Sequence, residues 1–204
     1  MALNYANNQS LSAITALPAS ITSGALTLLQ TQTASSSATI SFTSNIDSTY
    51  DAYMFKFYDI HPETNQKSFQ FQSSTNGGSS YGVTTTTTYF QADHPENDSS
   101  ATLTYVAGSD LAQSTSFQRL STATVNTNND DSLAGELFIY APSSTTFVKH
   151  FMARTNNYGQ ADESADSFKA GYFNTTTAIT RVRFKMTSGN IDSGTIKLYG
   201  IKDS

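Results

Sequence analysis

Apolar and polar side chains alternate with a period of two over much of the chain. Between residues 181 and 186, Val182, Phe184 and Met186 alternate with three cations, and residues 195–199 repeat the pattern. Because successive side chains of a β-strand point to opposite faces, these runs predict half-buried strands. The stretch between them is rich in Gly, Asn, Asp and Ser, which predicts a tight β-hairpin.

Similar runs follow one another from residue 24 to residue 201, with turn residues between them. They predict about eleven short strands and no long helix, which is typical of an all-β antiparallel sandwich with jelly-roll-like connectivity. The predicted strands span residues 25–32, 38–43, 50–60, 68–72, 84–91, 101–106, 135–140, 146–154, 168–173, 179–186 and 195–201.

Aromatic side chains at alternate positions predict the faces of the sheets. Three aromatic side chains lie on the opposite face from their apolar neighbours: Phe138, Tyr140 and Tyr199. Exposing them to water is unfavourable, so they predict an interface between copies of the chain. The inward set is predicted to fill one sheet with Tyr53, Phe55, Phe57, Phe69 and Phe71, and the opposing sheet with Leu137 and Ile139.

The first 23 residues differ from the rest. Residues 1–21 carry no charge, and aliphatic side chains recur there at three- and four-residue spacing. This pattern predicts an arm, residues 1–23, that orders against a neighbour ahead of a sandwich domain, residues 24–204; a disordered tail is the alternative. The predicted anchoring side chains are Tyr5, Leu11, Ile14, Leu17 and Ile21.

The composition limits the kinds of structure and partner that we expect for this chain. The chain has 204 residues, enough for one domain with an extension, and no cysteine, which excludes disulfides and thiolate-bound metals. Its net charge of −5 argues against a nucleic-acid partner. No Lys or Arg precedes Lys56, so we expect neither a secretory signal nor a membrane span.

Motifs that carry catalysis are missing. The sequence has no G-x-S-x-G elbow, no phosphate-binding glycine loop and no H-E-x-x-H. Its three histidines, His61, His94 and His150, lie far apart along the chain. We therefore expect a protein that is not an enzyme, with no catalytic residue, no metal and no cofactor.

Two acidic loops leave structural calcium open as an alternative. Neither loop has the spacing of an EF-hand, so solvated turns are the simpler interpretation, and an exposed turn is also expected at residues 160–166. The oxygen-bearing side chains are Asp93, Glu96, Asn97 and Asp98 in the first loop, and Asn129, Asp130 and Asp131 in the second.

Carbohydrate binding is an alternative function. Sandwiches often present aromatic and amide side chains on a loop rim, although tyrosines of this kind also pack in cores and interfaces. The candidate glycan-binding residues, near predicted loops or strand ends, are Tyr81, Tyr89, Asn156, Asn157 and Tyr158.

Three segments carry a resemblance to a known group. SGTIKLYGI at residues 193–201, ISFTSNIDSTYDAYMFKF at 40–57 and STTFVKHF at 144–151 resemble uncharacterised structural proteins of tailed bacteriophages, especially phages of marine bacteria. The resemblance extends from about residue 24 to the C-terminus.

This resemblance implies a virion protein, made in the bacterial host cytoplasm and displayed on the particle surface as a head decoration, fibre or tail appendage. The arm would tether it to other virion proteins, and analogy with phage appendages implies a homotrimer. The alternative within the same group is a receptor-recognition module of a phage tail that binds host-surface glycan.

Overall fold

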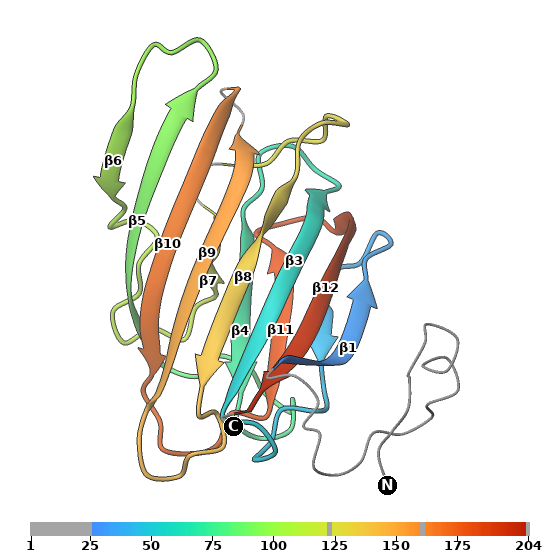
Figure 1. Cartoon of the computed structure of the whole chain (residues 1–204), viewed down its shortest axis with the longest axis vertical. Helices are drawn as coiled ribbons and strands as arrows, with labels where there is room; N and C mark the ends of the chain where they lie inside the picture. The colour runs from blue at the N-terminus through green and yellow to red at the C-terminus, as the bar shows by residue number, and fades with distance from the viewer. Residues whose placement is uncertain (1–25, 122–123, 160–161, 203–204) are drawn as a thin grey trace, which may run out of the picture.

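Twelve strands form two antiparallel sheets in the computed structural model, which describes residues 26–121, 124–159 and 162–202. None of the described residues is helical. Sheet A has eight strands and sheet B has four, and Figure 1 shows the long strands of sheet A side by side with β4 and β11 behind them. The predicted all-β sandwich is confirmed. The jelly-roll connectivity stays a prediction, and the proposed arm lies outside the described residues.

The order of strands within each sheet differs from their order along the chain. In spatial order, sheet A consists of β1 (Leu26–Thr33), β12 (Ile191–Ile201), β3 (Ala52–Pro62), β8 (Leu133–Tyr140), β9 (Lys149–Gly159), β10 (Glu163–Phe173), β5 (Thr85–Pro95) and β6 (Thr102–Tyr105). Sheet B consists of β2 (Ile40–Phe42), β11 (Arg181–Met186), β4 (Phe69–Ser74) and β7 (Gln118–Arg119).

Phe184 lies at the centre of the aromatic core between the sheets. Its ring centroid is 5.2 Å from Phe55 and 5.3 Å from Phe57, both in sheet A. Within sheet B it stacks on Phe69 at 5.6 Å and lies 6.3 Å from Phe71. Ring pairs at these separations add about 0.5–1.5 kcal/mol to the gain from burial. The inward register predicted for Phe55 and Phe184 is confirmed, since both are fully buried.

One predicted assignment within this core is wrong. β3 and β8 are neighbours in sheet A, with Phe55 opposite Leu137, so their aromatic and aliphatic side chains share one inner face. β4, which carries Phe69 and Phe71, belongs to sheet B instead. Alternation identifies which side chains are buried, but it contains no information on which sheet a strand joins.

The predicted C-terminal hairpin is also wrong. β11 pairs with β2 and β4 in sheet B, whereas β12 pairs with β1 and β3 in sheet A. Residues 187–190 therefore connect the two sheets. β12 begins earlier than predicted, at Ile191, and its pairing with β3 shifts register twice before Thr195. Phe184 and Leu198 pack in the same core from opposite sheets. Two strands that face each other across a core have the same alternation of apolar and polar residues as the two strands of a hairpin, so the sequence pattern does not distinguish the two arrangements.

The inner face of sheet A becomes polar around Tyr89 on β5, Thr155 on β9 and Lys169 on β10. The buried Lys169 Nζ donates to the Leu120 carbonyl and, at 2.9 Å, to Thr155 Oγ1, and it lies 4.6 Å from the centroid of the Tyr89 ring. Tyr89 donates its hydroxyl to Ser167 Oγ at 3.1 Å. We call these residues the polar cluster. The segment that contains β7 covers them, because Leu120 directly follows that strand.

Candidate functional site

The outer face of sheet A is uncovered in the described part of the chain. Cross-strand partners from five neighbouring strands form one row across it: Tyr199, Met54, Phe138, Met152 and Ala170. Each partner on β8 and β9 alternates with a buried inner residue, so strand register alone gathers these apolar side chains on one surface.

Three adjoining hollows lie on this face, and we call them together the outer groove. The first has a volume of about 380 Å³, and its lining includes Phe138, Tyr140, Phe90 and Phe168, with Met152. The Phe90 and Phe168 rings stack at 4.9 Å with an interplanar angle of 9°, and the Phe138 and Tyr140 rings stack at 6.3 Å and 12°. This part of the groove presents aromatic rings and little polar surface.

The second hollow continues the groove beyond Tyr140 and Met152. It has a volume of about 420 Å³ and shares Tyr140 and Met152 with the first hollow. Thr86, His150 and Tyr172 also line it, with the His150 and Tyr172 rings 6.2 Å apart. The exposed lining of this hollow is mostly apolar, so it extends the apolar surface of the groove.

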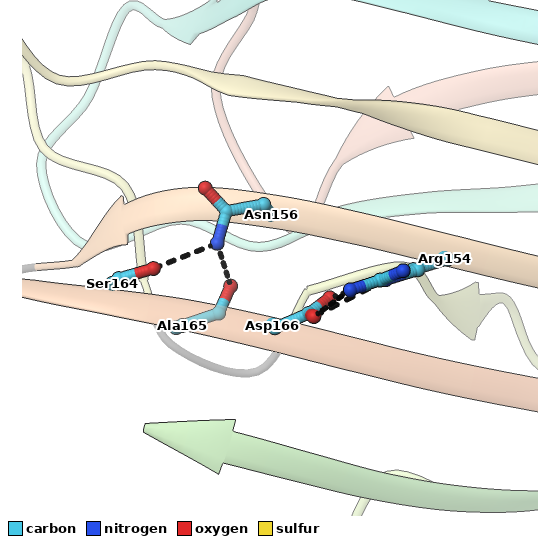
Figure 2. A network of polar contacts seen from close by, with 5 residues as sticks. All are labelled: Arg154, Asn156, Ser164, Ala165 and Asp166. Carbon is cyan, nitrogen blue, oxygen red and sulfur yellow. Dashed lines mark hydrogen bonds and ion pairs between the residues drawn. The ribbon is translucent and has the colours of Figure 1, made fainter. Parts of the chain in front are cut away.

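The third hollow, of about 350 Å³, holds an ion pair (Figure 2). Arg154 donates through Nε to both Asp166 carboxylate oxygens at 3.1 Å, and through Nη2 to Oδ2 at 2.6 Å. These hydrogen bonds raise the pKa of Arg154 above its ordinary value. The guanidinium carbon also lies 4.8 Å from the centroid of Phe168, so the ion pair is fixed beside the aromatic section.

Asn156 supplies an amide to the same hollow. Its Nδ2 donates to Ser164 Oγ at 2.9 Å and to the Ala165 carbonyl at 3.3 Å, and Figure 2 shows its side-chain oxygen pointing away from both partners. The groove thus combines aromatic faces, hydroxyls, an amide and a paired charge, which is chemistry suited to binding. Within the described ranges, no three His, Asp or Glu side chains lie close enough together to hold a metal ion.

The three side chains predicted to form an oligomer interface all lie on this outer face. Phe138 and Tyr140 line the first hollow. Tyr199 lies two strands away from Phe138, opposite Met54. The structure therefore brings these residues onto one surface, and their role in an interface stays a prediction.

The five candidate glycan-binding residues are not brought together. Asn156 lines the outer groove, Tyr158 follows it on the same strand, and Tyr81 packs beside sheet B. Tyr89 and Asn157 are buried on the inner face, so Tyr89 packs in the interior, as such tyrosines often do, and neither side chain lies at an accessible rim. Asn157 lies within β9 because that strand continues to Gly159, whereas Tyr89 already lies inside the predicted strand at residues 84–91; alternation along each strand directs both side chains inward.

The acidic loops are also shorter than predicted. β5 includes Asp93, β10 begins at Glu163, and Asp131 is buried instead of solvated. Carboxylates still gather at this end of sheet A. Desolvation of the Tyr158 hydroxyl, its hydrogen bond to Asp162 and the charges of nearby carboxylates raise its pKa to about 12.

Sequence reasoning missed most of the outer groove. Phe90, His150, Met152, Phe168 and Tyr172 were not among the predicted site residues, although all occupy outward positions of alternating runs. The alternation within β9 was a usable signal. Their convergence depends on the pairing of β8, β9, β10 and β5, which the pattern of each strand by itself does not contain.

Comparison of the chain with protein-family models, with curated proteins and with solved structures finds no match. In the described part of the chain, no helix has the length and apolar character needed to cross a membrane.

Proposed function

We propose that this chain is a bacteriophage virion structural protein, displayed on the particle surface, whose copies assemble through the outer face of sheet A. The phage assignment rests on the three sequence segments described above. The assembly surface rests on the distribution of exposed apolar side chains. A surface role in the particle is consistent with a site that offers binding groups without a catalytic constellation.

One observation carries the assembly proposal. Nine large hydrophobic side chains are exposed among the described residues, and strand register places eight of them on the outer face of sheet A. The exception is Phe147, in the connection between β8 and β9. A monomeric protein rarely gathers so many exposed apolar side chains on one face. The eight are Leu26, Leu28, Tyr58, Phe90, Leu103, Tyr105, Tyr140 and Met152.

A second copy of the chain is the partner that fits this surface. The exposed side chains extend from one edge strand, β1, to the other, β6, so the partner must be as broad as the sheet. With strands about 4.8 Å apart and a rise of about 3.3 Å per residue, the face covers on the order of 1,000 Å². Two such faces packed together would bury on the order of 2,000 Å², at the upper end of the roughly 1,200–2,000 Å² of a stable interface. The trimer implied by the resemblance to phage appendages would use the same face differently, with three copies turning it toward a common threefold axis.

Native mass spectrometry of the full chain tests this assembly. We expect an oligomer in the parent protein and a monomer after Met152→Glu, because a carboxylate at the centre of the interface would lose its hydration. Phe147→Glu is the matched control, since it introduces the same charge at an exposed hydrophobic position away from sheet A. A monomeric parent at tens of micromolar would contradict self-assembly, and absence of the chain from purified particles would contradict the virion assignment.

Host-glycan recognition is the second candidate function, and the third hollow favours it. There, Arg154, Asp166 and Asn156 place hydrogen-bonding groups next to an aromatic wall. This function needs an open groove, whereas face-to-face assembly closes it. Saturable glycan binding that Asn156→Ala weakens, in a protein that remains monomeric, would support recognition over assembly.

A further inference from the structure

Sheet B carries a concentration of positive charge. Its four strands contain four cationic residues and no acidic residue. All four cations lie at outward positions, alternating with buried residues such as Val182 and Phe184. The whole chain has a net charge of −5, so this surface opposes the overall charge. We call it the basic face: Arg119, Arg181, Arg183 and Lys185.

The basic face lacks the counter-charges found on sheet A. None of the three ion pairs among the described residues includes one of its cations. Cross-strand partners on β4 are neutral: Gln70 lies opposite both Lys185 and Arg119, and Gln72 lies opposite Arg183. Asp110 lines a neighbouring hollow of about 450 Å³ with Arg119, and its carboxylate accepts a hydrogen bond from Tyr105 at 2.6 Å.

Arg183 is held in place by aromatic and amide contacts. Its guanidinium carbon lies 4.2 Å from the centroid of Tyr81 and 5.0 Å from that of Phe117. Nε and Nη2 donate to Gln72 Oε1 at 3.3 and 2.7 Å, and Lys185 Nζ lies 5.4 Å from the centroid of Phe117. These contacts fix the cations without neutralising them, which lowers the entropic cost of binding an anion.

Arg181 adds a donor that lacks an acceptor. Its Nη1 donates to the Thr180 carbonyl at 2.7 Å, but its buried Nε has no hydrogen-bond partner among the described residues. A buried unpaired donor is uncommon because it loses its hydration without compensation. An oxyanion bound at this end of the basic face would supply an acceptor.

We infer that the basic face binds the carboxylate or sulfate groups of an acidic polysaccharide. Outward cations on β11 are about 6.7 Å apart, twice the rise per residue of a strand, so they suit anionic groups spaced along an extended polymer. Ser41, which lies opposite Arg183 on β2, adds a hydroxyl that suits a polymer carrying many hydroxyls of its own.

A nucleic acid is less well matched to this surface. Its affinity depends on many phosphate contacts, and four cations on a chain of net charge −5 supply few. Single-stranded nucleic acids also stack bases on free aromatic faces, whereas Tyr81 and Phe117 already have cations against their rings. The polysaccharide inference goes beyond the proposed assembly, because sheet B lies on the other side of the sandwich and remains open when the outer faces of sheet A pack together.

Binding of the full chain to four polymers tests the inference. The probes are polygalacturonate for carboxylate, dextran sulfate for sulfate, neutral dextran as the uncharged control, and a single-stranded oligothymidylate. We expect salt-sensitive binding to one or both acidic polysaccharides and none to neutral dextran. Binding to polygalacturonate only or to dextran sulfate only identifies the preferred anion. No binding to either, or tighter binding to the oligothymidylate, would overturn the inference.

Paired variants locate the site. Arg183→Gln with Lys185→Gln should weaken binding roughly tenfold or more, because two charge-assisted contacts are lost. Lys56→Gln with Lys197→Gln removes the same charge from the outer face of sheet A and should change binding less than about twofold. Equal losses in both pairs would contradict a defined site. Arg119→Gln, at an exposed position, gives a second test if the first variant folds poorly; unchanged binding in Arg119→Gln as well would contradict the basic face.

Discussion

The inner face of sheet A meets two different partners. Over β12, β3 and β8, the inward side chains pack against sheet B, and five rings surround Phe184 within 6.3 Å. Over the far ends of β5, β9 and β10, the inward side chains hydrogen-bond with one another and with the segment around β7. The same sheet therefore uses non-directional apolar packing in one region and directional polar contacts in the other.

The two regions should respond differently to substitution. Loss of a core ring leaves a cavity that neighbouring rings fill only in part, so its cost is large and largely insensitive to pH. Loss of a group from the polar cluster removes hydrogen bonds and changes the cost of burying a charge. Its effect on the free energy of unfolding therefore depends on pH and on whether the remaining polar groups keep hydrogen-bond partners. Four substitutions, from the largest expected effect to the smallest, test this difference.

Phe184→Ala should have the largest effect, lowering the free energy of unfolding by about 3–5 kcal/mol. The ring is fully buried and contacts both sheets, so no single neighbour can fill the space. Denaturant unfolding measures the change. Phe147→Ala, at a side chain that is 73% exposed, is the control and should stay within about 0.5 kcal/mol of the parent. A similar small change in both would show that the aromatic core is not the main source of stability.

Lys169→Met should alter how stability depends on pH. Burial lowers the pKa of Lys169 well below its ordinary value, so above this folded-state pKa the folded protein holds a neutral amine while the unfolded chain still binds a proton. Stability in the parent therefore rises with pH, from the folded-state pKa to the ordinary lysine pKa, by up to about 1.4 kcal/mol per pH unit.

The methionine variant should lack this contribution. Its stability advantage over the parent should be greatest below the folded-state pKa of Lys169 and should shrink as pH rises through the alkaline range. Denaturant unfolding at several pH values measures the difference, with Lys56→Met on the outer face as the control. Parallel curves for Lys169→Met and the parent would mean that the ammonium remains charged in the fold.

Tyr89→Phe should cost about 1–2 kcal/mol, the range for a hydrogen bond lost in a buried setting. The variant keeps the ring and removes the hydroxyl that donates to Ser167 at 3.1 Å. Ser167 retains its hydrogen bond to Gln91, which limits the loss. Thermal unfolding measures the change, and an unaltered midpoint would indicate that the polar cluster does not depend on this hydroxyl.

Arg154→Gln should have the smallest effect on stability of the four substitutions. The ion pair with Asp166 has good geometry, but the Arg154 side chain is 62% exposed, and solvent screens such pairs. A double-mutant cycle with Asp166→Asn isolates the coupling, which should fall as salt is added. A strong coupling that salt leaves unchanged would show that the third hollow behaves as a buried site.

The sequence did not predict the polar cluster on the inner face of sheet A. Thr155 and Lys169 occupy inward positions of β9 and β10, but polar side chains in an alternating run read as outward, because most such groups prefer water. Only the segment around β7, more than thirty residues away in sequence from Thr155, supplies the Leu120 carbonyl that receives both side chains. The strand β7 itself has two residues, too short to give a periodic signal.

The sequence by itself determined the all-β class, the approximate positions of eleven strands and the inward register of Phe55 and Phe184, because alternation is a local property with a fixed period. It also identified Phe138, Tyr140 and Tyr199 as outward. Only the tertiary structure decided that β11 and β12 lie in different sheets, that Tyr89 and Asn157 are buried, and that four cations share the outer face of sheet B. Those features depend on which strands pair, and pairing depends on contacts between residues far apart in the chain.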